Sequence, residues 1–153
     1  ITIRELIRTA LRMRPNRIIV GEVRGAEAID MLQALNTGHD GSLSTGHANS
    51  PKDMLSRLES MVLMGMDLPL GAVQRQIASG IDIIVHLGRL RDKSRKVLEV
   101  SEILDYQDGE ILVSPLYRFE ETGEKDGKIQ GTWRKMDDLV HTQKLLAAGY
   151  KEV

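Results

Sequence analysis

The first half of the chain alternates between helical and strand-like patterns of hydrophobic residues. Apolar residues recur at helical spacing in four stretches, and two short segments between them have the pattern of strands. Helices are expected at residues 3–13, 26–35, 50–64 and 69–79, and strands at residues 17–21 and 42–45. Ser50 and Pro51 mark the start of the third helix, as its N-cap and first helical residue. The order α-β-α-β-α-α indicates part of a parallel α/β sheet.

The second half has the pattern of antiparallel strands. Strands are expected at residues 81–90, 96–106, 110–120 and 128–134. Residues 91–94 and the pair Asp108-Gly109 supply the first two turns, and a loop rich in Gly, Glu and Lys precedes the last strand. A final helix is expected at residues 136–148, ended by Gly149. The chain thus divides by pattern into an α/β part (1–80), a strand and hairpin part (81–135) and a terminal helix (136–153).

Composition excludes several classes of protein. A length of 153 residues corresponds to about one domain, and 41% hydrophobic residues suffice for a buried core. No apolar run approaches the roughly 18 residues of a membrane span, and no signal-peptide pattern opens the chain. The absence of cysteine excludes disulfides and thiolate metal sites, and it agrees with a reducing compartment. The net charge of -1 predicts no general affinity for nucleic acid or for anionic membranes.

The beginning of the chain is locally basic. Its first 25 residues contain more arginines than acids: Arg4, Arg8, Arg12, Arg14, Arg17 and Arg24 against Glu5 and Glu22. A basic segment beside a candidate site suits a polyanionic ligand such as a nucleotide, although a solvated helix face gives the same pattern. The chain also starts at Ile1 without a methionine, which is typical of a fragment or a processed protein.

Glu22 follows the first predicted strand directly and is the first candidate for chemistry. Ligands of an open parallel sheet bind beyond the carboxyl ends of its strands, so a carboxylate there lies at the ligand-binding edge. It can orient or deprotonate a water, or hold Mg²⁺ through a water. The same pair, Gly21-Glu22, also fits the start of the following helix, where the helix dipole favours a negative charge. The pattern alone leaves both roles open.

Two histidines, His39 and His47, bracket the second predicted strand. Their spacing fits no standard zinc motif, and no cysteine or third histidine lies nearby in the sequence, so no directly bound metal is expected. His47, at the end of the strand, is instead expected to donate a hydrogen bond to a phosphate oxygen or an anionic intermediate. A structural polar role is the alternative. Because adjacent parallel strands end at the same edge, Glu22 and His47 should lie beside one pocket.

A phosphate-binding loop would decide between these roles, but the sequence contains no such motif. The nearest string, residues 123–129, has three residues between its glycines, where the P-loop requires four. It also has Ile129 where a serine or threonine must reach Mg²⁺. Phosphate chemistry at Glu22 therefore depends on a cradle that this sequence does not supply.

Two strings resemble motifs of the C-terminal ATPase region of the type II/type IV secretion (pilus-assembly) ATPase superfamily. Residues 18–25, Ile-Ile-Val-Gly-Glu-Val-Arg-Gly, resemble its Walker B segment. Residues 37–49, Thr-Gly-His-Asp-Gly-Ser-Leu-Ser-Thr-Gly-His-Ala-Asn, resemble its His box. Four further strings are similar to the Tad/Flp pilus-assembly (CpaF-like) subgroup: residues 10–15, 56–62, 75–79 and 117–131. The resemblance covers nearly the whole chain.

The resemblance implies a fold, and for the parent protein an activity and an assembly. The fold would be α/β, the C-terminal part of a RecA-like P-loop NTPase core with a parallel or mixed sheet and flanking helices, followed by antiparallel hairpins and a terminal helix. The parent protein would form a homo-hexamer that hydrolyses ATP with Mg²⁺ and drives assembly or export of pilus subunits. It would be cytoplasmic and peripheral to the inner membrane, docked on a platform protein, with no nucleic acid partner and no membrane span.

The resemblance also implies a site. Glu22 would be the catalytic glutamate, near Mg²⁺ held through water, and His47 would sense or contact the γ-phosphate. His39, Ser44 and Thr45 would line the same pocket, and Arg24 would hold the loop or a phosphate. Arg12 and Arg14 would contribute to the nucleotide or subunit interface.

In one respect the sequence departs from the family, because it begins after the point where the Walker A loop and most of the Asp box occur. The isolated chain is therefore expected to bind ATP poorly and to be inactive, with ATP hydrolysis as the function of the parent protein. Three alternatives stay open. They are a conjugation-type (type IV secretion) ATPase that moves DNA or effectors, a non-enzymatic interaction module, and a metal-dependent hydrolase that uses His39 and His47.

Overall fold

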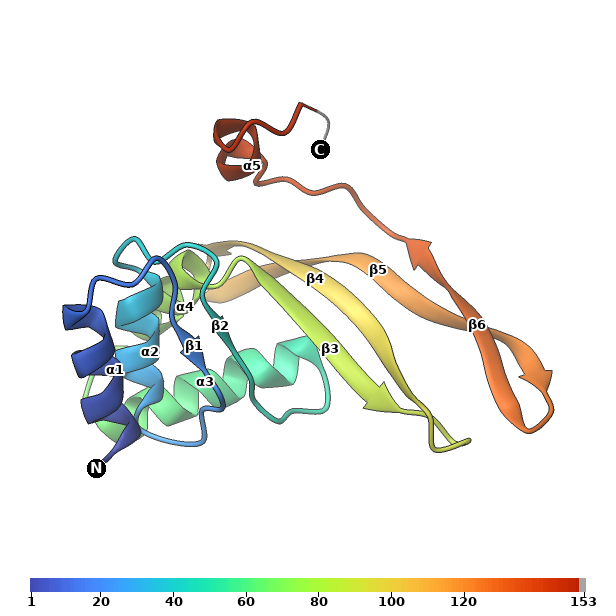
Figure 1. The fold of residues 1–153 in the computed structure, drawn as a ribbon, viewed down its shortest axis with the longest axis horizontal. Helices are drawn as coiled ribbons and strands as arrows, with labels where there is room; N and C mark the ends of the chain where they lie inside the picture. Colours follow the sequence, from blue (N-terminus) through green and yellow to red (C-terminus); the bar gives the residue numbers. More distant parts are fainter. Residues whose placement is uncertain (152–153) are drawn as a thin grey trace. The chain divides into compact units, whose positions relative to one another are not determined.

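The computed structural model of the chain describes residues 1–151, which form two compact units. The first unit comprises residues 1–81 together with 105–111, and the second comprises residues 82–104 and the chain from residue 112 onward. Figure 1 labels the helices and strands of both units in chain order. No helix within residues 1–151 is both long enough and apolar enough to cross a bilayer.

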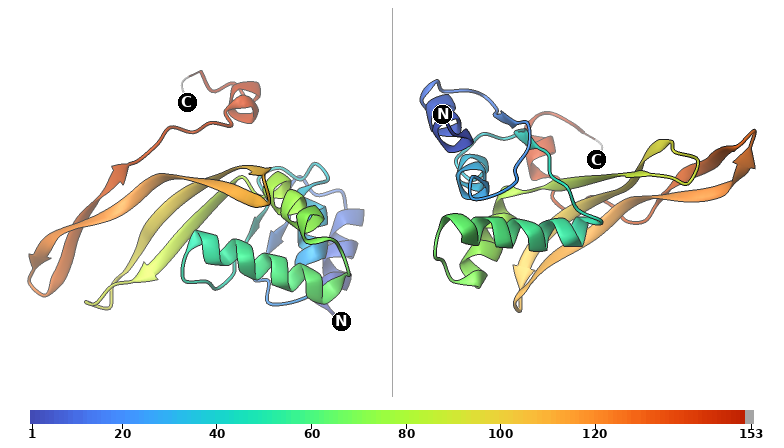
Figure 2. Two further views of the ribbon diagram at one scale, coloured as in Figure 1. Left: turned by 180° about the vertical axis from the view of Figure 1, so that it is seen from behind. Right: turned by 90° about the horizontal axis from the view of Figure 1, so that it is seen from below.

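The first unit contains four helices and a short parallel strand pair. Its elements are α1 (Ile3–Arg12), β1 (Ile19–Val20), α2 (Ala28–Leu35), β2 (Leu43–Ser44), α3 (Pro51–Gly65) and α4 (Leu70–Gly80). Ile19 lies opposite Leu43, and Val20 lies opposite Ser44, in a parallel register. Within this unit α2 contacts α1, α3 and α4, as the views of Figure 2 also show. The predicted parallel α/β arrangement is confirmed, with strands shorter than predicted.

The core of the first unit is built on α2, because this helix is apolar on several sides. Ala28 and Leu32 are fully buried, and Ile29 is nearly so. The neighbouring helices contribute Val62 from α3 and Ile77 from α4, both with no exposed surface. Burial of such side chains contributes about 1.5–3 kcal/mol each.

A buried ion pair fastens α1 to α2. Asp30 is only 4% exposed, and its carboxylate accepts a hydrogen bond from Arg4 Nε at 2.5 Å. Arg8 Nε lies 3.4 Å from the other carboxylate oxygen. Two of the arginines in the basic N-terminal segment therefore neutralise a buried acid, since an unpaired buried carboxylate is costly. Both arginines are therefore part of the contact between α1 and α2.

The second unit carries most of a four-stranded sheet. Its strands are β3 (Ile83–Arg89), β4 (Arg95–Gln107), β5 (Glu110–Lys125) and β6 (Lys128–Lys135), in the order β3-β4-β5-β6. The pairs β3/β4 and β5/β6 are antiparallel, as predicted. Residues 108–109, which belong to the first unit, have φ of 51° and 89°, and residues 126–127 have φ of 52° and 70°. Two successive positive φ angles are typical of the tight two-residue turns of hairpins.

Two predictions for the second half are wrong in extent. The expected loop before the last strand is mostly strand, because β5 continues to Lys125 and leaves only a two-residue turn. The final helix, α5 (Gln143–Ala147), starts later than predicted. Residues 137–142 do not join it, because the backbone N–H groups of Val140 and His141 donate to the Glu102 carboxylate. Gly149 follows the helix with a φ of 94°, in agreement with its expected stop.

Candidate functional site

The parallel register of β1 and β2 carries the segments after both strands to the same edge. Thr45 Oγ1 donates a hydrogen bond to the carbonyl of Gly21 at 2.5 Å, and Val23 N donates to the carbonyl of Thr45 at 3.0 Å. These bonds hold the two segments together for several residues beyond the strands. Glu22 and His47 meet as a result, with His47 Nε2 2.9 Å from Glu22 Oε1.

The two carboxylate oxygens of Glu22 have different surroundings. Oε2 lies 2.7 Å from Arg24 Nη2 in an ion pair. Oε1 is buried and makes no hydrogen bond with any described residue, although His47 Nε2 is close. The two atoms are near enough to form an ion pair when the imidazole is protonated, but they are not aligned as donor and acceptor. A buried acceptor without a hydrogen bond is unfavourable, and such an oxygen is suited to receive a water or a ligand donor.

Positive charge surrounds Glu22. The Arg24 guanidinium is the main cause that lowers the pKa of Glu22 below its usual value, and His47 and Arg57 add to this effect. Partial burial of the carboxyl opposes the shift without reversing it. Glu22 is therefore ionised at neutral pH and acts as an acceptor. The side chain of His47 is 80% exposed and is accessible to an incoming anion, whereas Arg24, which is 75% exposed, is held in its ion pair with Glu22.

Glu27 shapes the loop between Glu22 and α2, and sequence reasoning missed it. Its Oε1 accepts hydrogen bonds from the backbone N–H groups of Arg24 at 2.7 Å and Gly25 at 3.2 Å. Burial raises the pKa of Glu27, but these N–H groups outweigh that effect and lower it overall. The signal in the sequence was an acid in the first turn of the helix predicted at residues 26–35, and in the structure Glu27 is the N-cap of α2. Arg57, on α3, was also not assigned to the site.

The predicted pocket residues of the His box lie at different places. Thr45 holds the strand ends together, and Ser44 lies in β2 with an exposed side chain. His39 precedes β2, at the opposite end of the strand from His47, and its Nδ1 lies 3.1 Å from the carbonyl of Ala34 at the end of α2. The structure thus brings His47, and not His39, to Glu22. A nucleotide-binding role for His39, Ser44 or Thr45 stays a prediction.

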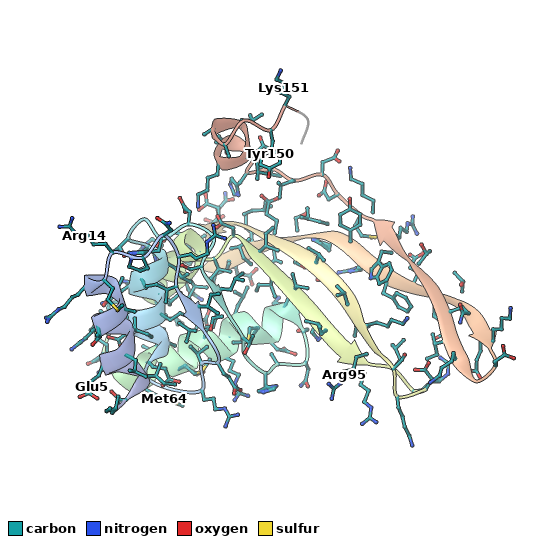
Figure 3. The ribbon with its side chains drawn as sticks, viewed as in Figure 1. Glu5, Arg14, Met64, Arg95, Tyr150 and Lys151 are labelled. Carbon is teal, nitrogen blue, oxygen red and sulfur yellow. The ribbon has the colours of Figure 1, made fainter. Side chains whose placement is uncertain are left out.

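Arg12 and Arg14 make no hydrogen bond or ion pair with the Glu22 carboxylate. Arg12 ends α1, and Arg14 follows it with a φ of 51° and points away from the ribbon in Figure 3. Neither side chain forms a hydrogen bond or an ion pair with the described residues. Both remain exposed and available to an interface, and their predicted roles stay predictions.

A largely apolar groove of about 570 Å³ lies beside the site in the first unit. It runs between α1 and β1, with Leu6, Ile7 and Ile19 on its walls and Glu22 and Arg24 at its polar end. Within residues 1–151, no three side chains of His, Asp or Glu gather as metal ligands.

Comparisons with known proteins show the family of the chain. A family model described as type II/IV secretion system protein matches residues 1–136. A protein of Mycobacterium tuberculosis whose name assigns it to conjugal transfer is 43% identical over 111 residues, which are 72% of this chain and 31% of that protein. Conjugal transfer protein TrbB of Rhizobium radiobacter is 39% identical over 103 residues, 67% of this chain and 31% of that protein.

A solved structure gives the same relationship in three dimensions. The VirB11 ATPase of the Brucella suis type IV secretion system, crystallised with sulphate, superposes with a TM-score of 0.62 at 36% identity. The match covers 65% of this chain and 31% of that protein. This chain spans less than a third of the length of each of these relatives. The chain belongs to the type II/IV secretion system protein family.

Proposed function

We propose that this chain carries the water-activating and γ-phosphate-facing part of the ATPase site of a type IV secretion motor. One observation carries the proposal: Glu22 Oε1 is a buried oxygen without a hydrogen bond, on an ionised carboxylate, with His47 Nε2 2.9 Å away. An ionised carboxylate can accept the proton of an attacking water. An exposed histidine beside it can donate to an anionic oxygen of the substrate.

The charges of the site suit the phosphate end of a nucleotide. Phosphoryl transfer needs positioning and positive charge around the transferred group, and the surroundings of Glu22 supply Arg24, His47 and Arg57. When bound, Mg²⁺ would neutralise charge on the phosphates, held through water near Glu22. No phosphate-binding loop occurs in the sequence, so the phosphate cradle must come from another polypeptide segment.

Type IV secretion of the conjugal-transfer kind is our leading function for the parent protein. The relatives described above are named for conjugal transfer and type IV secretion. They favour the alternative, movement of DNA or effectors, over the assembly of pilus subunits that the sequence resemblance placed first. A Tad/Flp-type pilus motor is the second candidate, supported by the four similar strings, and the exported substrate distinguishes the two.

For the whole protein we further propose a homo-hexamer that hydrolyses ATP with Mg²⁺ at the cytoplasmic face of the inner membrane, on a platform protein. These features rest on membership of the family and on the VirB11 likeness. They concern the whole protein and its assembly, and not the contacts within this chain.

The test replaces Glu22 by glutamine in a full-length protein that contains this chain. Glu22→Gln keeps the size of the side chain and removes its ability to take a proton, so ATP hydrolysis should be lost while nucleotide binding persists. Glu110→Gln is the matched control, because the side chain of Glu110 is exposed and forms no hydrogen bond or ion pair with the described residues. Turnover of Glu22→Gln equal to that of Glu110→Gln would end the catalytic assignment.

A further inference from the structure

In the loop that carries Glu22, hydrogen bonds fix the backbone but not the rotation of the Glu22 carboxylate. Val23 N donates to the Thr45 carbonyl at 3.0 Å, and Arg24 N donates to Glu27 Oε1 at 2.7 Å. The backbone from Glu22 to Arg24 is thus anchored to the residue after β2 and to the N-cap of α2. The rotation of the carboxylate about its own bonds is not set by these contacts.

The contacts of the carboxylate itself set that rotation. Arg24 Nη2 holds Oε2 at 2.7 Å, and this leaves Oε1 buried, without a hydrogen bond and directed toward His47. If the carboxylate turned over, the two oxygens would exchange places. The ion pair therefore distinguishes two oxygens that are chemically the same, and it leaves one of them for a new donor.

We propose that Arg24 is a positioning residue, whose ion pair with Glu22 Oε2 keeps Oε1 directed at the water that attacks the γ-phosphate. The proposal rests on the proposed function, since it assigns a role only if Glu22 acts on that water. Oε1 takes one proton from the water as the water oxygen bonds to the γ-phosphorus. The bond from that phosphorus to the β–γ bridging oxygen breaks, and ADP leaves with its electron pair.

Arg57 offers a matched comparison because it acts on Glu22 through charge alone. Its positive charge lowers the pKa of Glu22, as that of Arg24 does, but its side chain makes no ion pair or hydrogen bond with the carboxylate or with other described residues. Arg57→Gln removes one charge from the surroundings of Glu22, and Arg24→Gln removes one charge together with the contact to Oε2. The difference between the two variants isolates the positioning effect.

The kinetic test uses a full-length protein that contains this chain. Misplacement of a catalytic group lowers kcat, so Arg24→Gln should reduce kcat by about 10- to 100-fold. The ATP dissociation constant should stay within about twofold of wild type, because the contact is made to Glu22 and not to the nucleotide. Arg24→Lys should recover most of the loss, since one donor at Oε2 suffices for the single contact, whereas Arg57→Gln should have a smaller effect on kcat.

A second readout does not depend on activity. The pKa of the Glu22 carboxyl, followed by ¹³C NMR in this chain, should rise in Arg24→Gln more than in Arg57→Gln. An unchanged Glu22 pKa in Arg24→Gln would overturn the contact, and so the proposal. A raised ATP dissociation constant with normal kcat would also overturn it, because Arg24 would then bind phosphate.

Failure of the wider assignment looks different. Wild-type turnover in Glu22→Gln would remove the proposed function itself. Loss of turnover in Glu22→Gln together with normal kcat in Arg24→Gln would overturn the positioning role alone.

Discussion

Glu102 is a buried carboxylate that connects β4 to the segment before α5, and its replacement gives a sharp test of the second unit. Its side chain is 1% exposed. Both oxygens are used: Oε2 accepts the backbone N–H of Val140 and Oε1 accepts that of His141, each at 2.8 Å. His141 Nδ1 also lies 3.1 Å from Oε1. The buried carboxylate is tolerated here because each of its oxygens accepts a backbone hydrogen bond.

Glu102→Gln keeps the shape of the side chain but replaces one acceptor oxygen by an NH₂ group. One of the two backbone N–H groups must then face a donor, whichever way the amide is turned. A hydrogen bond to a charged acceptor contributes about 1.5–3 kcal/mol. The change should therefore favour local release of residues 137–142 by about that amount, which corresponds to roughly a 10- to 150-fold increase in opening.

Amide hydrogen exchange measures this release at the residues concerned. The amides of Val140 and His141 should exchange faster in Glu102→Gln by about one to two orders of magnitude, if their exchange requires local opening. The exposed substitution Glu110→Gln should leave both amides unchanged. Equal protection of Val140 and His141 in wild type and Glu102→Gln would refute the assignment of Glu102 as the anchor of this segment.

Two further predictions concern the site and the sheet. His47→Ala in a full-length protein should lower ATP turnover by about 10- to 1000-fold, the loss of one donor to the transition state, and unchanged steady-state kinetics would leave His47 a structural role. Hydrogen bonds from Ser94 and Ile129 lower the pKa of Asp92 to about 2. The ionised carboxylate therefore stabilises the folded state above its ordinary pKa of 3.8, and this contribution disappears as the pH falls toward 2. Between pH 5 and 2, the free energy of unfolding measured with denaturant should thus depend less on pH for Asp92→Asn than for wild type. Equal slopes of this free energy against pH would contradict the linkage.

Local chemistry made most of the elements predictable, and long-range contacts explain where prediction failed. Ser50 caps α3 through a hydrogen bond from Asp53 N at 3.0 Å, as its position before Pro51 predicted. The terminal helix was predicted too long because Glu102, 38 residues away from Val140, accepts backbone N–H groups in the first half of the predicted helix. The spacing of apolar residues in a helix does not predict this contact, since the Glu102 carboxylate is distant in sequence and comes near only after β4 has formed.

The same distinction applies inside the candidate site. Glu22 and His47 were predictable as neighbours because two parallel strands that end together bring their following residues to one edge. The sequence could not show that Arg24 contacts Oε2 while Oε1 stays without a hydrogen bond, because that depends on how Glu27 anchors the loop. Strand topology therefore decides which residues meet, whereas the loop decides which oxygen is left for water. A homologue that keeps Glu22 and His47 but loses the acid at position 27 should consequently show a less fixed carboxylate and slower turnover.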